Sequence, residues 1–299
     1  MQEKTQSGFH QSDGAAADTG LDEQGLIHNT CSPDKIQREF LPVVDALLDN
    51  LNLAFPGEIH SVYLYCSVAR GVAEIGRSDL DISLIFNHQI QASQRERLRE
   101  ISCEFPRRFS QISKLDLDPG CLEEVLHPRE KYRWQFWLKH CCCCISGDDI
   151  AKTFEALKPS RNIALELNHD LAAFLSFSSE HVAGREVKVQ NRVLAKKILR
   201  TAYYLNAERH GSWYTDLAMC ARVAKLYYPQ QTEQIDTAYT LARGGDCSPA
   251  AFKVLTSQLG TMLVKQMATM TRYSAQMDED MNDEVRAPKD VTPASLINR

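Results

Sequence analysis

The sequence predicts an α+β protein in which a mixed β-sheet flanked by helices is followed by an all-α helical bundle. Short apolar runs at strand spacing are concentrated in the first half of the chain, and apolar residues recur at helical spacing after Gly147-Asp148-Asp149. A length of 299 residues also exceeds the usual single domain. We therefore expect four segments: a disordered tail over 1–32, the sheet domain over 33–150, a helical domain over 151–275 and a disordered acidic tail over 276–299.

The sheet domain opens with a helix signal. Ser32 is a capping residue followed by Pro33, and apolar residues from Ile36 onward recur at helical spacing until Pro56-Gly57. A strand over 62–65, a turn-like segment with Gly71 and Gly76, and a strand over 80–86 follow. A polar helix around 95–100 then precedes a third strand over about 112–117, which Pro119-Gly120 is expected to end.

Four consecutive cysteines, Cys141 to Cys144, predict a buried strand. Adjacent strand residues alternate between faces, so these thiols cannot readily surround one tetrahedral zinc ion. The ten cysteines show no regular spacing, which favours buried thiols over a disulfide framework. Beyond this strand, two helical faces are expected, one from Leu194 to Leu205 and one from Phe252 to Leu263.

Composition limits the classes of partner. The first residues lack a secretory signal, and no apolar run reaches the roughly 20 residues that span a bilayer, so we expect a cytoplasmic protein without a membrane partner. A net charge of −5 and a pI near 6.0 disfavour nucleic acid, which requires a basic surface. A small molecule or a protein is the better substrate class.

The strongest chemical signal is acidic. In a strand, Asp79 and Asp81 point to one face while Leu80 and Ile82 point to the other. Two such carboxylates can share a pair of hard cations about 3.5–4 Å apart. The alternative is an ordinary solvated strand edge. Upstream, backbone amides and the Ser67 hydroxyl could cradle phosphates.

The third strand adds carboxylates at Asp116 and Asp118. We favour Asp116 for the site, because it is expected mid-strand while Asp118 adjoins the Pro119 turn. A surface-facing strand residue is the alternative interpretation of Asp116.

These motifs resemble the nucleotidyltransferase superfamily, the DNA polymerase beta-like proteins, whose signature is Gly-Ser, a spacer of about ten residues, and Asp-x-Asp. Here the signature reads Cys66-Ser67, an eleven-residue spacer and Asp79-Leu80-Asp81. The resemblance is closest to the aminoglycoside adenylyltransferase-like branch. It covers roughly residues 35–265 and includes Gly147-Asp148-Asp149 and the helix start from Trp213 to Ala218.

The resemblance implies that ATP or another nucleoside triphosphate is the co-substrate, with its phosphates near Ser67 and Gly71. It also implies a two-metal Mg²⁺ site, whose ligands would be Asp79, Asp81 and Asp116. Asp116 is either the third metal ligand or the base that accepts a proton from the substrate. Lys197 and Arg200 are candidates to bind the triphosphate, although a charged helix is usually a solvated face.

Two residues depart from the family pattern. Cys66 adds a side chain where glycine lets a phosphate approach the backbone. Thr215 precedes Asp216, where the antibiotic adenylyltransferases normally have a lysine, so one phosphate contact is lost.

The expected function is metal-dependent transfer of a nucleoside monophosphate, AMP from ATP, to a hydroxyl of an unidentified small-molecule acceptor. An aminoglycoside-type antibiotic is one such acceptor, because an acidic cleft suits a cation. Two alternatives stay open: a nucleotidyltransferase that modifies a protein or tRNA, and a non-catalytic nucleotide-binding module.

Overall fold

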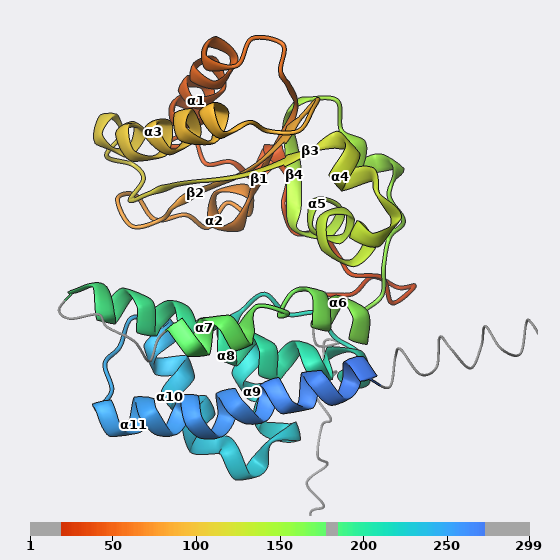
Figure 1. Cartoon of the computed structure of the whole chain (residues 1–299), viewed down its shortest axis with the longest axis vertical. Coiled ribbons are helices and arrows are strands. Elements are labelled where there is room, and N and C mark those ends of the chain that lie inside the picture. The colour runs from red at the N-terminus through yellow and green to blue at the C-terminus, as the bar shows by residue number, and fades with distance from the viewer. Residues whose placement is uncertain (1–18, 178–184, 273–299) are drawn as a thin grey trace, which may run out of the picture. The chain divides into compact units, whose positions relative to one another are not determined.

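The structure, a computed structural model, describes residues 19–177 and 185–272. Within this part the chain forms two compact units. The first contains the residues up to Ser160 together with Ala207–Tyr214, and the second contains Arg161–Asn206 and the residues from Thr215 onward. Figure 1 shows a sheet with helices in the first unit and helices alone in the second, so the predicted α+β class is confirmed.

The first unit is built on a mixed four-stranded sheet. Its strands are β1 (Ile59–Tyr65), β2 (Leu80–Phe86), β3 (Leu115–Cys121) and β4 (Cys142–Gly147), in the order β3-β2-β1-β4. β1 pairs antiparallel with both β2 and β4, whereas β2 and β3 run parallel. β2 has the predicted bounds.

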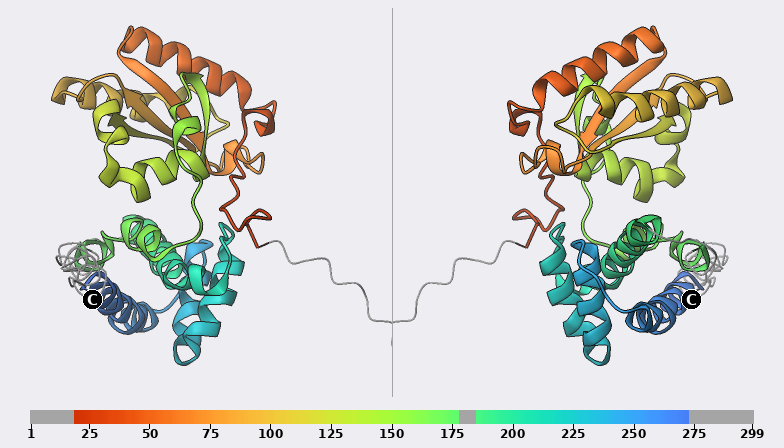
Figure 2. Two further views of the ribbon diagram at one scale, coloured as in Figure 1. Left: turned by 90° about the vertical axis from the view of Figure 1, so that its right-hand side faces the viewer. Right: turned by 90° about the vertical axis from the view of Figure 1, so that its left-hand side faces the viewer.

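Helices cover the two faces of this sheet differently. α1 (Leu41–Ala54) and α3 (Ala92–Arg108) pack on the face that carries Leu64, Ile82 and Leu84, and this is the larger core. α4 (Leu122–Leu126) and α5 (Phe136–Cys141) cover part of the opposite face. The turned views of Figure 2 also show α1 and α5 on opposite sides of the sheet. The remaining short helical segments of this unit are η1 (Pro33–Lys35), α2 (Cys66–Ala69), η2 (Pro128–Glu130), η3 (Lys131–Gln135) and η4 (Ile150–Thr153).

The second unit is helical throughout its described residues. The face of α8 predicted from periodicity is buried, since Leu194, Ile198 and Ala202 are 0–2% exposed. Asp216 caps α9 by accepting hydrogen bonds from the amides of Ala218 and Met219, both at 2.9 Å. Its elements are α6 (Arg161–Glu166), α7 (Leu171–Phe177), α8 (Arg185–His210), α9 (Leu217–Tyr227), η5 (Pro229–Gln231), α10 (Thr232–Ala242), α11 (Pro249–Val254) and η6 (Leu255–Gly260), with further helix over 261–272.

Several expected element bounds were wrong: β1 begins at Ile59 instead of residue 62, and β3 begins at Leu115 instead of about residue 112. Prolines explain two further differences. The helix expected from Ser32 begins only at Leu41, because Pro42 lacks an amide hydrogen and is tolerated in a first turn but not in a helix interior. Ser32 instead caps the short η1 turn. β3 runs through Pro119 and Gly120 instead of ending there, since it is an edge strand, where proline is allowed.

The expected disordered tail over 1–32 was wrong for residues 19–32, which pack onto the first unit. Thr19 accepts a backbone hydrogen bond from Trp213 at 2.7 Å, and the side-chain amide of Asn29 donates to the carbonyls of Lys139 and Cys142. Ile27 is 4% exposed. Individual hydrogen bonds attach this segment to the rest of the unit. Its sequence therefore lacks the regular spacing of apolar residues that would have revealed it. The rest of that tail and the acidic tail over 276–299 lie outside the described residues.

A buried histidine joins this segment to the end of the unit. His140 Nε2 accepts a hydrogen bond from the Leu157 amide at 2.9 Å, so Nδ1 carries the proton and donates to the Ile27 carbonyl at 2.8 Å. Ile27 and Leu157 are also bonded to each other through their backbones. The first unit therefore extends to Ser160 instead of ending near residue 150 as expected.

Three residues of the cysteine run, Cys142 to Cys144, lie in the predicted strand, whereas Cys141 ends α5. Cys142 and Cys143 in β4 are buried, and burial raises the pKa of the Cys143 thiol to about 12, so it stays protonated. All ten cysteines are thiols.

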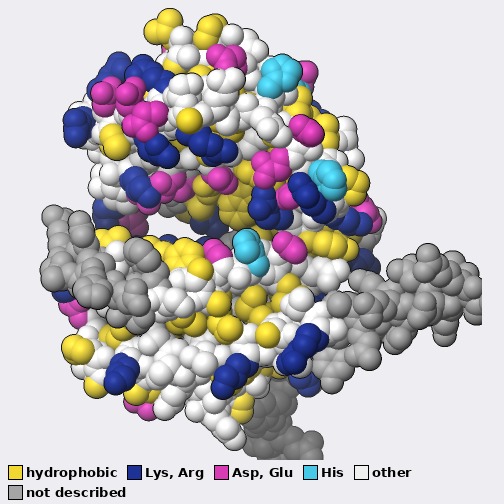
Figure 3. Space-filling model, in the orientation of Figure 1, with side chains coloured by type: hydrophobic (Ala, Val, Ile, Leu, Met, Phe, Trp, Pro, Cys, Tyr) yellow, Lys and Arg dark blue, Asp and Glu magenta, His cyan; other side chains and the backbone are white. Residues whose placement is uncertain are grey.

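The surface of the first unit mixes charges of both signs on the face drawn in Figure 3. On α3, Arg97 pairs with Glu100 and Arg99 pairs with Glu96. None of the described helices is long and apolar enough to cross a membrane.

The bridging role of His140 gives a stability prediction. His140→Phe leaves the Ile27 carbonyl and the Leu157 amide buried without partners, so we expect it to lower the free energy of unfolding by about 2 kcal/mol or more. Urea denaturation at pH 8 measures this loss. The exposed His88→Gln is the matched control and should change nothing.

The same residue predicts a pH dependence. Burial lowers the pKa of His140 below its ordinary value of 6.5, so the neutral ring stabilises the fold above that pH. As the pH falls below 6.5 the unfolded chain binds the proton first, and this contribution is lost. The wild-type protein should therefore lose more stability than His140→Phe between pH 7 and pH 5; equal losses would contradict the assignment.

Candidate active site

Three aspartates meet at the amino ends of two parallel strands. Asp79 precedes β2, Asp81 is its second residue, and Asp81 lies directly opposite Asp116 of β3 in the register. Side chains at matched positions of adjacent strands point to the same face, which here is the face away from the larger core. The charges of Asp79 and Asp116 both act on Asp81. The structure thus brings together the three predicted acidic residues.

The turn before these strands explains the Cys66 departure. Cys66 has a φ of +62° and is the one described residue other than glycine with a positive φ. This left-handed conformation costs a non-glycine residue about 1 kcal/mol, whereas glycine adopts it freely. The backbone at this position therefore has the geometry that suits the signature glycine, although cysteine occupies it.

Ser67 and Gly71 belong to the short segment that follows. Ser67 is half-buried in α2, and its carbonyl accepts a hydrogen bond from Val72. Gly71 has a φ of +72°, and a Cβ there would lie 2.6 Å from the carbonyl oxygen of Lys35. Gly71 is thus required by the packing of η1 against this turn, and its proposed contact with phosphate stays a prediction.

Each outer aspartate has a partner that the sequence analysis missed. Asp79 Oδ1 accepts a hydrogen bond from the Ser113 hydroxyl at 2.6 Å. Asp116 Oδ1 forms an ion pair with Lys114 Nζ at 2.5 Å. Lys114 precedes Asp116 by two residues, so the period of a strand is a signal from which this shared face could have been predicted.

Burial and the crowding of the three carboxylates raise the pKa of the middle one, Asp81. Burial, followed by the charges of Asp79 and Asp116, raises the pKa of Asp81 from 3.8 to about 6. A side-chain hydrogen bond with the Cys66 thiol and the charge of Lys114 oppose this increase. At neutral pH the Asp81 carboxylate is therefore ionised at an energetic cost, which a cation in the site would relieve.

Two aromatic side chains border the acidic face. Tyr65 lies opposite Asp81 on β1, and burial together with the charges of Asp81 and Asp118 raises the pKa of its hydroxyl, which stays protonated. The Trp137 ring packs edge-on against Tyr65 with centroids 5.1 Å apart, and its Nε1 donates to the Ser83 hydroxyl at 3.3 Å. Sequence reasoning missed this border, because it is formed by residues from different elements.

The three aspartates have the kind of oxygen ligand that Mg²⁺ binds, although their carboxylates are not arranged around one point in the structure. Carboxylate oxygens are the ligands that Mg²⁺ prefers, and the Lys114 ammonium already acts as a stand-in cation among them. Among the described residues, no group of three or more His, Cys, Asp or Glu side chains is arranged to hold a metal ion. To bind such an ion, Asp79 would give up its hydrogen bond with Ser113, and Asp116 would give up its ion pair with Lys114.

The predicted phosphate-binding residues of the helical unit have partners within that unit. Lys197 Nζ forms an ion pair with Asp170 at 2.5 Å and donates to the Leu167 carbonyl at 2.8 Å. Arg200 lies near Cys220, whose thiolate form its charge favours. Nucleotide binding by Lys197 and Arg200 stays a prediction.

The raised pKa of Asp81 predicts that this residue destabilises the fold at neutral pH. Because its folded pKa lies above the unfolded value of 3.8, the penalty appears as the pH rises from 3.8 and is complete above about 6. We expect Asp81→Asn to raise the free energy of unfolding by roughly 1–3 kcal/mol at pH 7 in EDTA, and by almost nothing near pH 4. Thermal denaturation at both pH values tests this. Asp45→Asn, on the exposed surface of α1, is the control.

The comparisons with known proteins bear on this fold. No family model matches the sequence, and a search of curated proteins finds no match. Among solved structures, the chain is similar to the spectinomycin adenyltransferase AAD(9) from Enterococcus faecialis, solved with ATP and spectinomycin. The TM-score is 0.53 at 10% sequence identity, and the match covers 76% of this chain and 98% of that chain. The chain therefore shares the fold of that structure, and it has the predicted architecture of a mixed sheet flanked by helices with an all-helical unit.

Proposed function

We propose that this protein is a metal-dependent nucleotidyltransferase that transfers AMP from ATP to a hydroxyl of a small molecule. The observation that carries the proposal is the convergence of Asp79, Asp81 and Asp116 on one face of paired parallel strands. The fold likeness to an enzyme solved with ATP and spectinomycin supports both substrate classes. An aminoglycoside-type antibiotic is the first acceptor class to test.

The roles of the residues follow from where they lie. Asp79, Asp81 and Asp116 would hold Mg²⁺, which would neutralise triphosphate charge and stabilise the leaving pyrophosphate. The Ser67 hydroxyl and the amides of α2 would contact the phosphates, with Gly71 closing the turn behind them. Asp116 would either complete the metal site or accept the proton of the attacking hydroxyl.

In this proposal, Lys114 partly neutralises the aspartates in the metal-free protein and leaves them when metal binds. Its ammonium pairs with Asp116, and the charges of all three aspartates act on it. The side chain is 63% exposed and long enough to move away. We expect Lys114 to leave the carboxylates when metal binds, because two cations at one site repel each other.

The site assignment predicts a sharp contrast within one strand. Asp116→Ala should reduce AMP transfer by about 10³-fold or more, as Asp79→Ala and Asp81→Ala should, because each removes charge stabilisation at the reacting phosphate. Asp118→Ala, two residues further along β3, should keep most of the activity. The assay uses labelled ATP, Mg²⁺, spectinomycin and a panel of aminoglycosides.

Two results of this assay would count against the proposal. Equal activity of Asp116→Ala and Asp118→Ala would contradict the site assignment. Metal-dependent ATP binding without transfer to any acceptor would favour a non-catalytic nucleotide-binding module, and transfer to a protein or tRNA would change the acceptor class.

The role of Lys114 has its own test, which needs no acceptor. Lys114→Met removes the competing cation, so Mg²⁺ should bind several-fold more tightly, and the melting temperature of the metal-free protein should fall. Thermal shift against Mg²⁺ concentration measures both effects. Lys131→Met is the matched control, because this lysine pairs with Glu155 outside the site. Weaker Mg²⁺ binding by Lys114→Met would show that the lysine supports the metal site instead of competing with it.

A further inference from the structure

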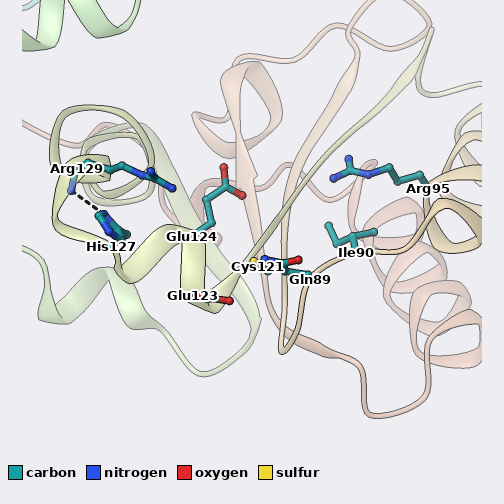
Figure 4. Close-up of a pocket in the computed structure, with 8 residues that line it drawn as sticks. All are labelled: Gln89, Ile90, Arg95, Cys121, Glu123, Glu124, His127 and Arg129. Atoms are coloured by element: carbon teal, nitrogen blue, oxygen red, sulfur yellow. Dashed lines mark hydrogen bonds between the residues drawn. The ribbon is translucent and has the colours of Figure 1, made fainter.

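A cavity opens at the other end of the same two strands. Its volume is about 310 Å³, and its walls include Ile90, Arg95, Cys121, Glu123, Glu124 and Arg129. Figure 4 shows Arg95 and Ile90 on one side, and Glu124, His127 and Arg129 on the other. All of these residues belong to the first unit.

The cavity is separate from the three aspartates. In the register Asp81 lies opposite Asp116 and Phe86 opposite Cys121, so the cavity is about 17 Å further along the strands at 3.3 Å per residue. It lies beyond the carboxyl ends of β2 and β3, which α3 connects. The crevice beyond the carboxyl ends of parallel strands is where open sheets commonly bind ligands.

Most charges around the cavity pair with one another. Arg133 binds Glu124 at 2.6 Å and Glu130 at 2.7 Å. Arg129 lies 3.8 Å from Glu130 on the same short helix. These four side chains form a neutral network that leaves little charge for a ligand.

Two charges remain, one on each side of the cavity. Within the described part of the chain, neither the Arg95 side chain on α3 nor the Glu123 side chain on α4 forms an ion pair or a hydrogen bond. Both line the cavity. The side chain of Ile90 and the buried Cys121 also line the cavity. The cavity thus offers one guanidinium, one carboxylate and an apolar contact.

We propose that this cavity binds a free α-amino acid with an apolar side chain. The ligand carboxylate would form the two parallel hydrogen bonds that a guanidinium favours with Arg95. The ligand ammonium would pair with Glu123, and its side chain would lie against Ile90 and Cys121. The volume is at the lower end of the range for small-molecule pockets, which suits a molecule the size of leucine.

The experiment compares three probes on the full chain without nucleotide or metal. They are L-leucine, N-acetyl-L-leucine, which lacks the ammonium, and L-leucinamide, which lacks the carboxylate. Isothermal titration calorimetry should show leucine binding at least about tenfold more tightly than either analogue, because each analogue leaves one charge unpaired.

Two exposed substitutions assign the contacts. Arg95→Gln should abolish the preference for leucine over leucinamide, and Glu123→Gln should abolish the preference over N-acetyl-leucine. Arg99→Gln is the matched control on α3, since Arg99 pairs with Glu96 and does not line the cavity. An unchanged melting temperature verifies that each variant folds.

The outcomes that would overturn the proposal are distinct. They are no binding of any probe, equal binding of leucine and N-acetyl-leucine, and leucine binding that survives both substitutions. Displacement of leucine by inorganic phosphate at equal affinity would identify a general anion site instead. None of these results depends on nucleotidyl transfer, so the two proposals can fail separately.

Discussion

The parallel pairing of β2 with β3 is the constraint on which the candidate active site depends. It sets Asp81 opposite Asp116, while Leu80, Ile82 and Leu115 on the opposite face belong to the larger core. A slip of one residue would turn the aspartates of one strand into this core and expose its apolar side chains. Burial of the apolar face therefore keeps the carboxylates close together, although their like charges repel one another.

Charge concentration is the cost of this arrangement, and neighbouring groups reduce it. Ser113 binds Asp79, Lys114 binds Asp116, and the Cys66 thiol shares a hydrogen bond with Asp81. The remaining cost appears as the raised pKa of Asp81. A site of this kind is prepared for a cation, because binding one replaces repulsion with attraction.

The β2-α3-β3 segment carries different functional groups at the two ends of its strands. The amino ends carry three carboxylates at matched or adjacent positions, whereas the carboxyl ends border a cavity whose unpaired charges are Arg95 and Glu123. One rigid pair of strands connects both ends. The same backbone hydrogen bonds therefore fix the geometry of the acidic site and of one wall of the cavity.

The sequence by itself determined the β2 strand, the strand that contains Cys142 to Cys144 and the helical second unit, because these follow from local side-chain periodicity. It did not reveal that β3 passes through Pro119, since this depends on β3 being an edge strand. Residues 19–32 were also missed, because single long-range bonds such as those of His140 hold them. The partners of Asp79 and Asp116 and the cavity walls were decided only by tertiary structure, which fixes how near side chains from separate elements come.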